Sequence, residues 1–177
     1  MGGLALYNWE NVIGFAKHEF QPPGGDKLIE FEMNVELIEA LQEVRTTAER
    51  LYGFARSIIH RNGGFSIKGH AEDSLHYKGR AADFHVEVRK DRDSPWRRIS
   101  PIELGCICYE LTCAHFGLGI YKWGVHLDYR RGIMGRTPAV WFQAANGQYH
   151  FKPWGEFYKV IYEAVDDNAE LLDTLEP

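Results

Sequence analysis

Short strand-like segments lie on both sides of a helical stretch in this chain, and glycine-containing tight turns join them. Tight turns connect antiparallel neighbours, whereas parallel strands need longer crossover connections. The pattern therefore predicts an α+β fold with a mostly antiparallel central sheet flanked by helices. The length of 177 residues suits a single domain.

The clearest predicted helix covers residues 34–53, because apolar residues recur there at steps of three and four, with Asn34 as the N-cap. A second helix is predicted over 100–116, with Ser100 as N-cap and Pro101 at the first helical position. The other predicted elements are a closing helix over 157–165 and strands over 57–60, 81–88, 118–121, 125–129 and 139–143.

The predicted organisation has three parts within one domain. Residues 1–33 contain a Pro-Pro-Gly-Gly turn signal and read as an irregular N-terminal segment. Residues 34–165 form the folded domain, and residues 166–177 form an acidic tail that we expect to be loosely held.

Charge and hydropathy exclude several classes of partner. The formal net charge is -5, so no electrostatic field favours nucleic acid or an anionic membrane. The basic residues between Arg89 and Arg98 are interrupted by aspartates and are predicted to lie in a solvated loop. No apolar run approaches the ~20 residues that span a bilayer, so no membrane span is expected. The oligomeric state stays open.

Two histidines and an aspartate suggest a metal site. His76 and Asp83 flank a glycine-containing turn that leads into a predicted strand, so both side chains can converge on one point. A hydrolytic zinc needs three protein ligands and an open position. The best third candidate is His126, on a strand where Asp128 and Arg130 project to the same face. Spacing alone does not decide, because a lone strand histidine is more often a hydrogen-bonded structural residue.

Two motifs resemble those of a known family. The pattern Ser74-x-His76-x-x-Gly79-x-Ala81-x-Asp83 resembles the zinc signature of the D-alanyl-D-alanine carboxypeptidase family of cell-wall metallopeptidases. That family includes vancomycin-resistance D,D-dipeptidases and phage L-alanyl-D-glutamate endopeptidases. The signature is also similar to the zinc-binding segment of the hedgehog signalling domain, which shares the fold. The segments 117–121 and 125–128 resemble the family's glycine-rich strand and final ligand strand, and the likeness covers roughly residues 34–130.

The resemblance implies a zinc peptidase domain over 34–165, with a hedgehog-like fold and Zn²⁺ held by His76, Asp83 and His126. The expected activity is hydrolysis of peptide bonds in peptidoglycan stem peptides, as a D,D-carboxypeptidase or an endopeptidase. An alternative is a non-catalytic zinc domain on the same fold that binds a protein or the cell wall. A metal-free domain is the third possibility.

The expected catalytic and substrate-binding residues depart from the family pattern. Many members carry a carboxylate three residues before the last histidine ligand, where this chain has Trp123. Asp128 is the nearest carboxylate and is predicted to be the general base, although it could equally orient a ligand. Arg61 matches the position of the family arginine that holds a substrate carboxylate, unless it is a surface charge. Ser74 is expected to form a hydrogen bond near the site.

The expected location of action conflicts with the N-terminus. The presumed substrate lies outside the bacterial membrane, yet the apolar stretch before residue 8 is too short for a secretory signal. Synthesis in the cytoplasm and action at the cell wall would be reconciled by a phage or prophage origin. Removal of a signal during maturation is the other explanation.

Overall fold

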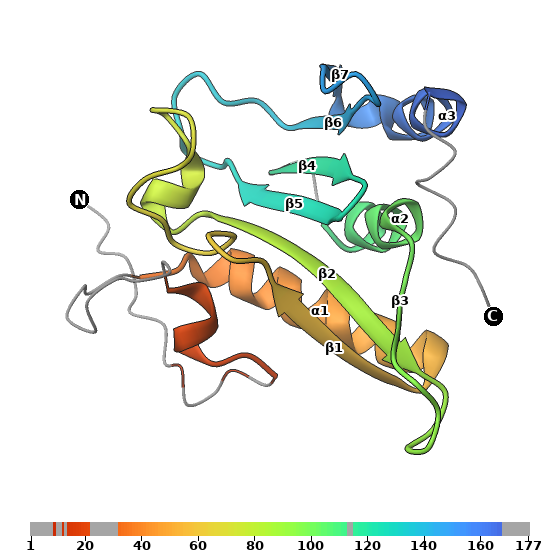
Figure 1. The fold of residues 1–177 in the computed structure, drawn as a ribbon. Coiled ribbons are helices and arrows are strands. Elements are labelled where there is room, and N and C mark those ends of the chain that lie inside the picture. Colours follow the sequence, from red (N-terminus) through yellow and green to blue (C-terminus); the bar gives the residue numbers. More distant parts are fainter. Residues whose placement is uncertain (1–8, 10–11, 13, 22–31, 113–114, 168–177) are drawn as a thin grey trace.

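The described residues form a single α+β domain, in which three helices lie against a mixed, mostly antiparallel sheet of seven strands, and this confirms the predicted fold class (Figure 1). The computed structural model describes residues 9, 12, 14–21, 32–112 and 115–167. The helices are α1 (Val35–Tyr52), α2 (Pro101–Leu111) and α3 (Phe157–Asp167), and the 3-10 turns are η2 (Lys17–Phe20), η3 (Leu75–Lys78) and η4 (Trp154–Glu156). The strands are β1 (Phe54–Ile59), β2 (Ala81–Arg89), β3 (Arg97–Arg98), β4 (Phe116–Tyr121), β5 (Gly124–Tyr129), β6 (Ala139–Gln143) and β7 (Tyr149–Pro153).

The strand order is β1-β2-β5-β4-β6-β7, and the short β3 pairs with β2. The pairing of β4 with β6 is parallel, and the other pairings between described strands are antiparallel. Helices α1 and α2 contact each other; α1 contacts β1, β2 and β5, α2 contacts β2, β4 and β5, and α3 contacts β6 and β7. Ala82 and Phe84 point from β2 into the core beneath these helices. Asp83 lies between them in sequence and therefore projects from the opposite face.

Both predicted N-caps are present. The Asn34 side chain accepts a hydrogen bond from the Leu37 amide at 3.0 Å, so α1 begins where the sequence predicts. Ser100 accepts in the same way from the Glu103 amide at 3.1 Å, with Pro101 opening α2.

The predicted end of α2 is wrong. The helix stops at Leu111 because Thr112 is extended, with φ −101° and ψ 142°, and its hydroxyl donates to the Cys108 carbonyl at 2.6 Å. The Thr112 amide donates to the same carbonyl at 2.9 Å, so Thr112 caps the last turn through two bonds to Cys108. Phe116, which was assigned to the helix, is the first residue of β4.

Two strands, β3 and β7, were not predicted from the sequence. Arg97 and Arg98 form β3 rather than a solvated loop, because Arg98 pairs with Glu87 across the sheet and the Arg97 guanidinium lies over the Tyr52 ring. Strand β7 was also not predicted, and its residues are mostly exposed.

The described part of the N-terminal segment belongs to the core. Phe15 and Phe20 are buried, and Phe20 ends the short turn η2. At the other end, helix α3 extends two residues into the predicted acidic tail. Residues 168–177 of that tail lie outside the described residues.

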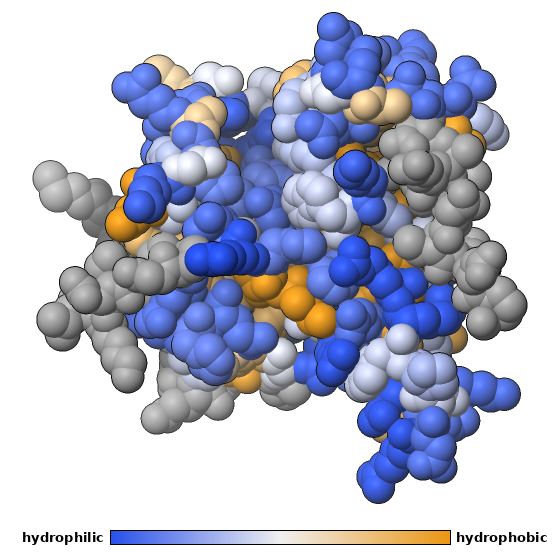
Figure 2. Space-filling model, in the orientation of Figure 1, coloured by the Kyte–Doolittle hydropathy of each residue, from blue (hydrophilic) through white to orange (hydrophobic). Residues whose placement is uncertain are grey.

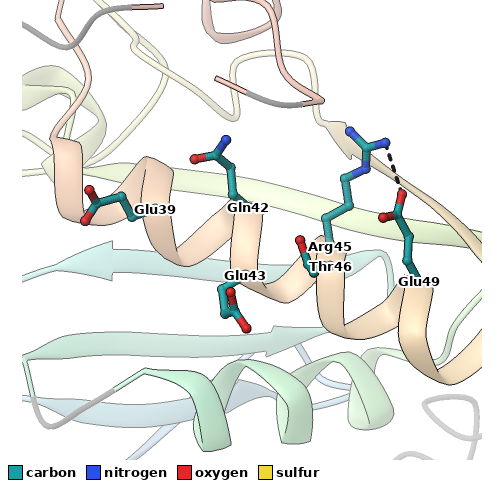
Figure 3. Close-up of a pocket in the computed structure, with 6 residues that line it drawn as sticks. All are labelled: Glu39, Gln42, Glu43, Arg45, Thr46 and Glu49. Carbon is teal, nitrogen blue, oxygen red and sulfur yellow. Dashed lines mark hydrogen bonds and ion pairs between the residues drawn. The ribbon is translucent and has the colours of Figure 1, made fainter. Parts of the chain in front are cut away.

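The outer surface of α1 is polar. A surface hollow lies along this helix, and Figure 3 shows the side chains that line it, among them the ion pair between Arg45 and Glu49 at 3.1 Å. Its lining residues are Glu39, Gln42, Glu43, Arg45, Thr46 and Glu49. Hydrophilic residues also cover most of the face visible in Figure 2. Within the described ranges, the structure contains no helix with the length and apolar character needed to cross a bilayer.

Candidate metal centre

The three predicted metal ligands meet on the helix-free face of the sheet. Asp83 on β2 and His126 on β5 are direct cross-strand partners, and His76 reaches them from the turn η3. His126 Nδ1 lies 2.7 Å from Asp83 Oδ1 and 3.3 Å from His76 Nε2. His76 Nε2 lies 3.4 Å from Asp83 Oδ2. Three groups of the type that bind metals therefore face a common point.

Each imidazole is oriented by a bond on its far nitrogen. His76 Nδ1 donates to the Gly64 carbonyl at 2.8 Å, so His76 Nε2 is left with its lone pair toward Asp83. His126 Nε2 donates to Asp128 Oδ2 at 3.0 Å, which leaves Nδ1 as the inward nitrogen. Lone pairs and a carboxylate this close repel one another unless a cation, either a proton or a metal ion, lies between them. Hydrogen bonds of this kind orient histidine ligands in metal sites.

The donor set and its spacing fit a tetrahedral metal. Ligands about 2.0–2.1 Å from a tetrahedral zinc are about 3.3–3.4 Å from each other, close to two of the three distances here. The third distance, between His126 and Asp83, is that of a charge-assisted hydrogen bond. Two imidazoles and one carboxylate also match the ligand types that zinc prefers.

His70 is a fourth side chain at this point, and the sequence analysis missed it. The ligand atoms of His70, His76 and Asp83 lie within 4.8 Å of one another, so these three residues form a group that could hold a metal ion. The His70 ring is stacked on His76, with centroids 4.1 Å apart and planes at 18°. His70 Nε2 lies 3.0 Å from the Asn62 carbonyl oxygen and is engaged by the backbone, whereas His126 Nδ1 lies 2.7 Å from Asp83 Oδ1 and 3.3 Å from His76 Nε2. His126 is therefore better oriented than His70 as the third ligand.

A buried ion pair supports His126 from behind. Both oxygens of Asp128 accept bonds from Arg130, at 2.6 Å from Nε and 3.0 Å from Nη2, and Arg130 also donates to the Thr137 carbonyl at 2.9 Å. A Cβ at Gly117 would lie 2.3 Å from the Arg130 guanidinium. The glycine in this strand therefore makes room for the arginine that holds Asp128.

This arrangement bears on the predicted general base. Asp128 is buried, and its oxygens are engaged by His126 Nε2 and by Arg130. It lies at the outer edge of the His126 ring, whereas the inward nitrogen faces Asp83 and His76. The geometry favours the alternative in which Asp128 orients a ligand, with Arg130 paired to Asp128.

The charges of the group are set by these bonds. Burial alone would raise the pKa of Asp83, but hydrogen bonds from His126 and His76 outweigh it and hold the pKa well below the usual value. Burial would likewise lower the pKa of His126, but hydrogen bonds to Asp128 and Asp83 raise it to about 9. The metal-free centre therefore holds a proton on His126 at neutral pH.

Metal binding is expected to become tighter as pH rises. A metal ion on His126 Nδ1 displaces the proton that the metal-free protein keeps below a pKa of about 9. Affinity should therefore increase up to about tenfold per pH unit between pH 6 and 8, with about one proton released from His126 per ion. Calorimetric titration in buffers of different ionisation enthalpy measures both quantities. A metal affinity that does not change across this range would contradict the assignment.

A groove runs along the sheet beside the centre. Its volume is about 230 Å³. The lining residues are Ala71, Asp73, Ser74, Leu75, Tyr121, His126, Asp128, Arg130, Arg136, Trp141, Tyr149 and Phe151. Tyr149 and Phe151 are 51% and 62% exposed, so β7 offers an aromatic wall to solvent.

The two predicted substrate-binding residues lie in different places. Ser74 lines the groove, and its hydroxyl accepts from the His76 amide at 3.4 Å as the cap of η3. Arg61 is exposed in the turn after β1 and is not among the residues that line the groove. The turn that contains Arg61 adjoins Asp83, because the His60 amide donates to the Asp83 carbonyl at 2.9 Å and the Asp83 amide donates to the Gly63 carbonyl at 2.7 Å.

Tyr121 offers a polar group to the groove. Its hydroxyl accepts a hydrogen bond from Trp141 Nε1 at 2.9 Å, and the described residues provide no acceptor for its own proton. Burial raises the pKa of Tyr121, which keeps that proton in place. A Cβ at Gly119 would lie 2.5 Å from Trp141 Nε1, so this glycine lets the indole lie flat against β4.

Comparisons with protein-family models, with curated proteins and with solved structures find no match to this chain. The functional argument therefore depends on the site itself.

Proposed function

We propose that this protein is a zinc-dependent peptidase that hydrolyses peptide bonds in the stem peptides of bacterial cell walls. The observation that carries the proposal is the convergence of His76 Nε2, Asp83 and His126 Nδ1, with each imidazole held by a separate acceptor. His76, Asp83 and His126 would hold the metal. The choice of cell-wall peptides rests on the resemblance of the segments 74–83 and 125–128 to cell-wall peptidases.

A zinc ion held by three side chains supplies a Lewis acid that activates water and polarises a carbonyl group. The chain's own residues contribute orientation and hydrogen bonding. Asp128 and Arg130 fix the His126 ring. Tyr121 can donate its proton to a substrate oxygen in the groove, because Trp141 already occupies its acceptor position.

One observation favours the alternative, a non-catalytic zinc domain that binds a protein or the cell wall. The two carboxylates that line the groove are both engaged, Asp128 by His126 and Arg130, and Asp73 by Arg136. A proton acceptor for water therefore has to come from Asp73 after its ion pair opens, or from the substrate.

Metal removal tests the proposal. Zinc-loaded protein is expected to release amino groups from purified peptidoglycan or from synthetic stem peptides. Chelation is expected to lower the rate at least about 100-fold, since a Lewis acid contributes several kcal/mol to the barrier. Re-addition of one equivalent of zinc should restore the rate. Stoichiometric zinc binding without amino-group release would contradict the peptidase and support the non-catalytic zinc domain. Absence of zinc binding would contradict both proposals.

A further inference from the structure

The groove contains two arginines with very different bonding. Arg130 is buried and its donors are committed to Asp128 and Thr137. Arg136 has Nη2 bonded to the carboxylate and to the carbonyl of Asp73, and no described residue accepts a bond from its other guanidinium nitrogens. Arg136 is therefore the groove guanidinium that can exchange its partner.

We propose that Arg136 binds a carboxylate of the substrate, and that Asp73 occupies the same guanidinium until the substrate displaces it. The carboxylate would come from a short peptide lying in the groove, and this part rests on the proposed peptidase function. Arg61, which was expected to do this, is not among the residues that line the groove.

The ion pair that has to open is an exposed one. The Asp73 side chain is 76% exposed and that of Arg136 is 30% exposed. Exposed ion pairs contribute little to stability because water solvates both partners and salt screens them. Exchange of Asp73 for a substrate carboxylate therefore requires little free energy. A guanidinium can also hold the incoming carboxylate through two parallel hydrogen bonds.

The backbone at both residues permits the exchange. Asp73 precedes the turn η3, and Arg136 closes a turn after β5 through its amide bond to the Ile133 carbonyl at 3.1 Å. Neither residue belongs to a strand, so the pair can separate without breaking the sheet. Asp73 is three residues before His76, and Arg136 lines the same groove as His126 and the apolar Phe151.

Peptide binding by metal-free protein tests the proposal without any turnover. The probes are an acetylated Lys-D-Ala-D-Ala peptide with a free C-terminus, its C-terminal amide, and an amidated peptide with a D-glutamate side chain. Arg136→Gln should weaken binding of the free acid about 10–100-fold and leave binding of the amide unchanged. Arg136→Lys should bind the free acid with an affinity between those of the wild type and Arg136→Gln, because an ammonium keeps the charge but cannot form two parallel hydrogen bonds. Comparison of the free acid with the D-glutamate peptide shows which carboxylate Arg136 takes.

Asp73→Asn is the more discriminating variant, because the proposal predicts that it binds the free acid more tightly. Removing the competing carboxylate should tighten binding of the free acid about two- to fivefold, a gain that a purely structural role for Asp73 would not produce. Arg92→Gln, on the exposed turn after β2, is the matched charge control and should change nothing. Equal weakening of acid and amide by Arg136→Gln, or weaker binding by Asp73→Asn, overturns the proposal.

The outcomes separate this proposal from the peptidase. If binding of the free acid depends on Arg136 but the zinc-loaded protein cleaves nothing, the anion site is supported and the peptidase function is contradicted. If the protein cleaves the peptide with a KM that Arg136→Gln does not change, the peptidase function is supported and the anion site is contradicted.

Discussion

Replacing His76 by alanine is expected to abolish specific metal binding. The substitution removes one of the three converging ligands, so zinc affinity should fall by more than about 100-fold, beyond the range seen when only a ligand's hydrogen-bond partner is lost. Peptide hydrolysis should fall to the rate of the chelated protein. The same change also deletes the bond to the Gly64 carbonyl and leaves a small void, at a cost of about 1–3 kcal/mol in the free energy of unfolding.

Leu75→Ala is the control for that destabilisation. Leu75 is the buried neighbour of His76 in the same turn, and its truncation should cost about 2–5 kcal/mol while leaving all three ligands intact. The Leu75 variant should therefore be at least as unstable as the His76 variant and still bind one zinc. Equal metal affinity in wild type and His76→Ala would rule out the centre described above.

Truncating Asp128 to alanine is expected to have the largest effect on stability. Arg130 would be left buried without its carboxylate partner, which costs about 3–5 kcal/mol in the free energy of unfolding. His126 would lose the acceptor that fixes its outer nitrogen, so metal affinity should also fall about 10–100-fold.

Chemical denaturation and metal titration of this variant distinguish the two roles considered for Asp128. A residue that orients His126 and neutralises Arg130 changes both stability and metal affinity. A general base facing the groove would leave both nearly intact and lower only the rate. Asp128→Asn, which preserves the shape and can still accept one bond from Arg130, should lie between wild type and alanine in stability.

Much of the fold was predictable because its signals are local. Asn34 and Ser100 are caps whose effect depends on residues within one turn, and both helices begin where the sequence indicates. The end of α2 was not predictable in the same way. The sequence 112–116 is apolar enough to continue a helix, and only the extended backbone of Thr112 and the pairing of Phe116 with Tyr129 end it at Leu111.

The site was predictable only in part, because its geometry depends on strand register. Asp83 and His126 are 43 residues apart and meet because β2 and β5 pair with these two residues opposite each other. A shift by one residue would turn one of them to the other face. His70 lies in a loop, where no hydrophobic periodicity marks its position. Hydrogen bonds between the Tyr77 hydroxyl and the His70 backbone amide and carbonyl hold it there. The absence of Arg61 from the lining of the groove, and the presence of Arg136 in it, likewise depend on the paths of loops.

The packing of Phe20 means that the first part of the chain helps to shape the metal-binding turn. The Phe20 carbonyl accepts from the Phe65 amide at 2.8 Å, and a Cβ at Gly64 would lie 2.5 Å from the Phe20 backbone. Gly64 in turn orients His76 through its carbonyl. A shortened chain that began at residue 34 would keep all three ligands but would lose the packing behind Gly64, which orients His76. The smallest unit that binds the ion with full affinity therefore extends back to Phe20.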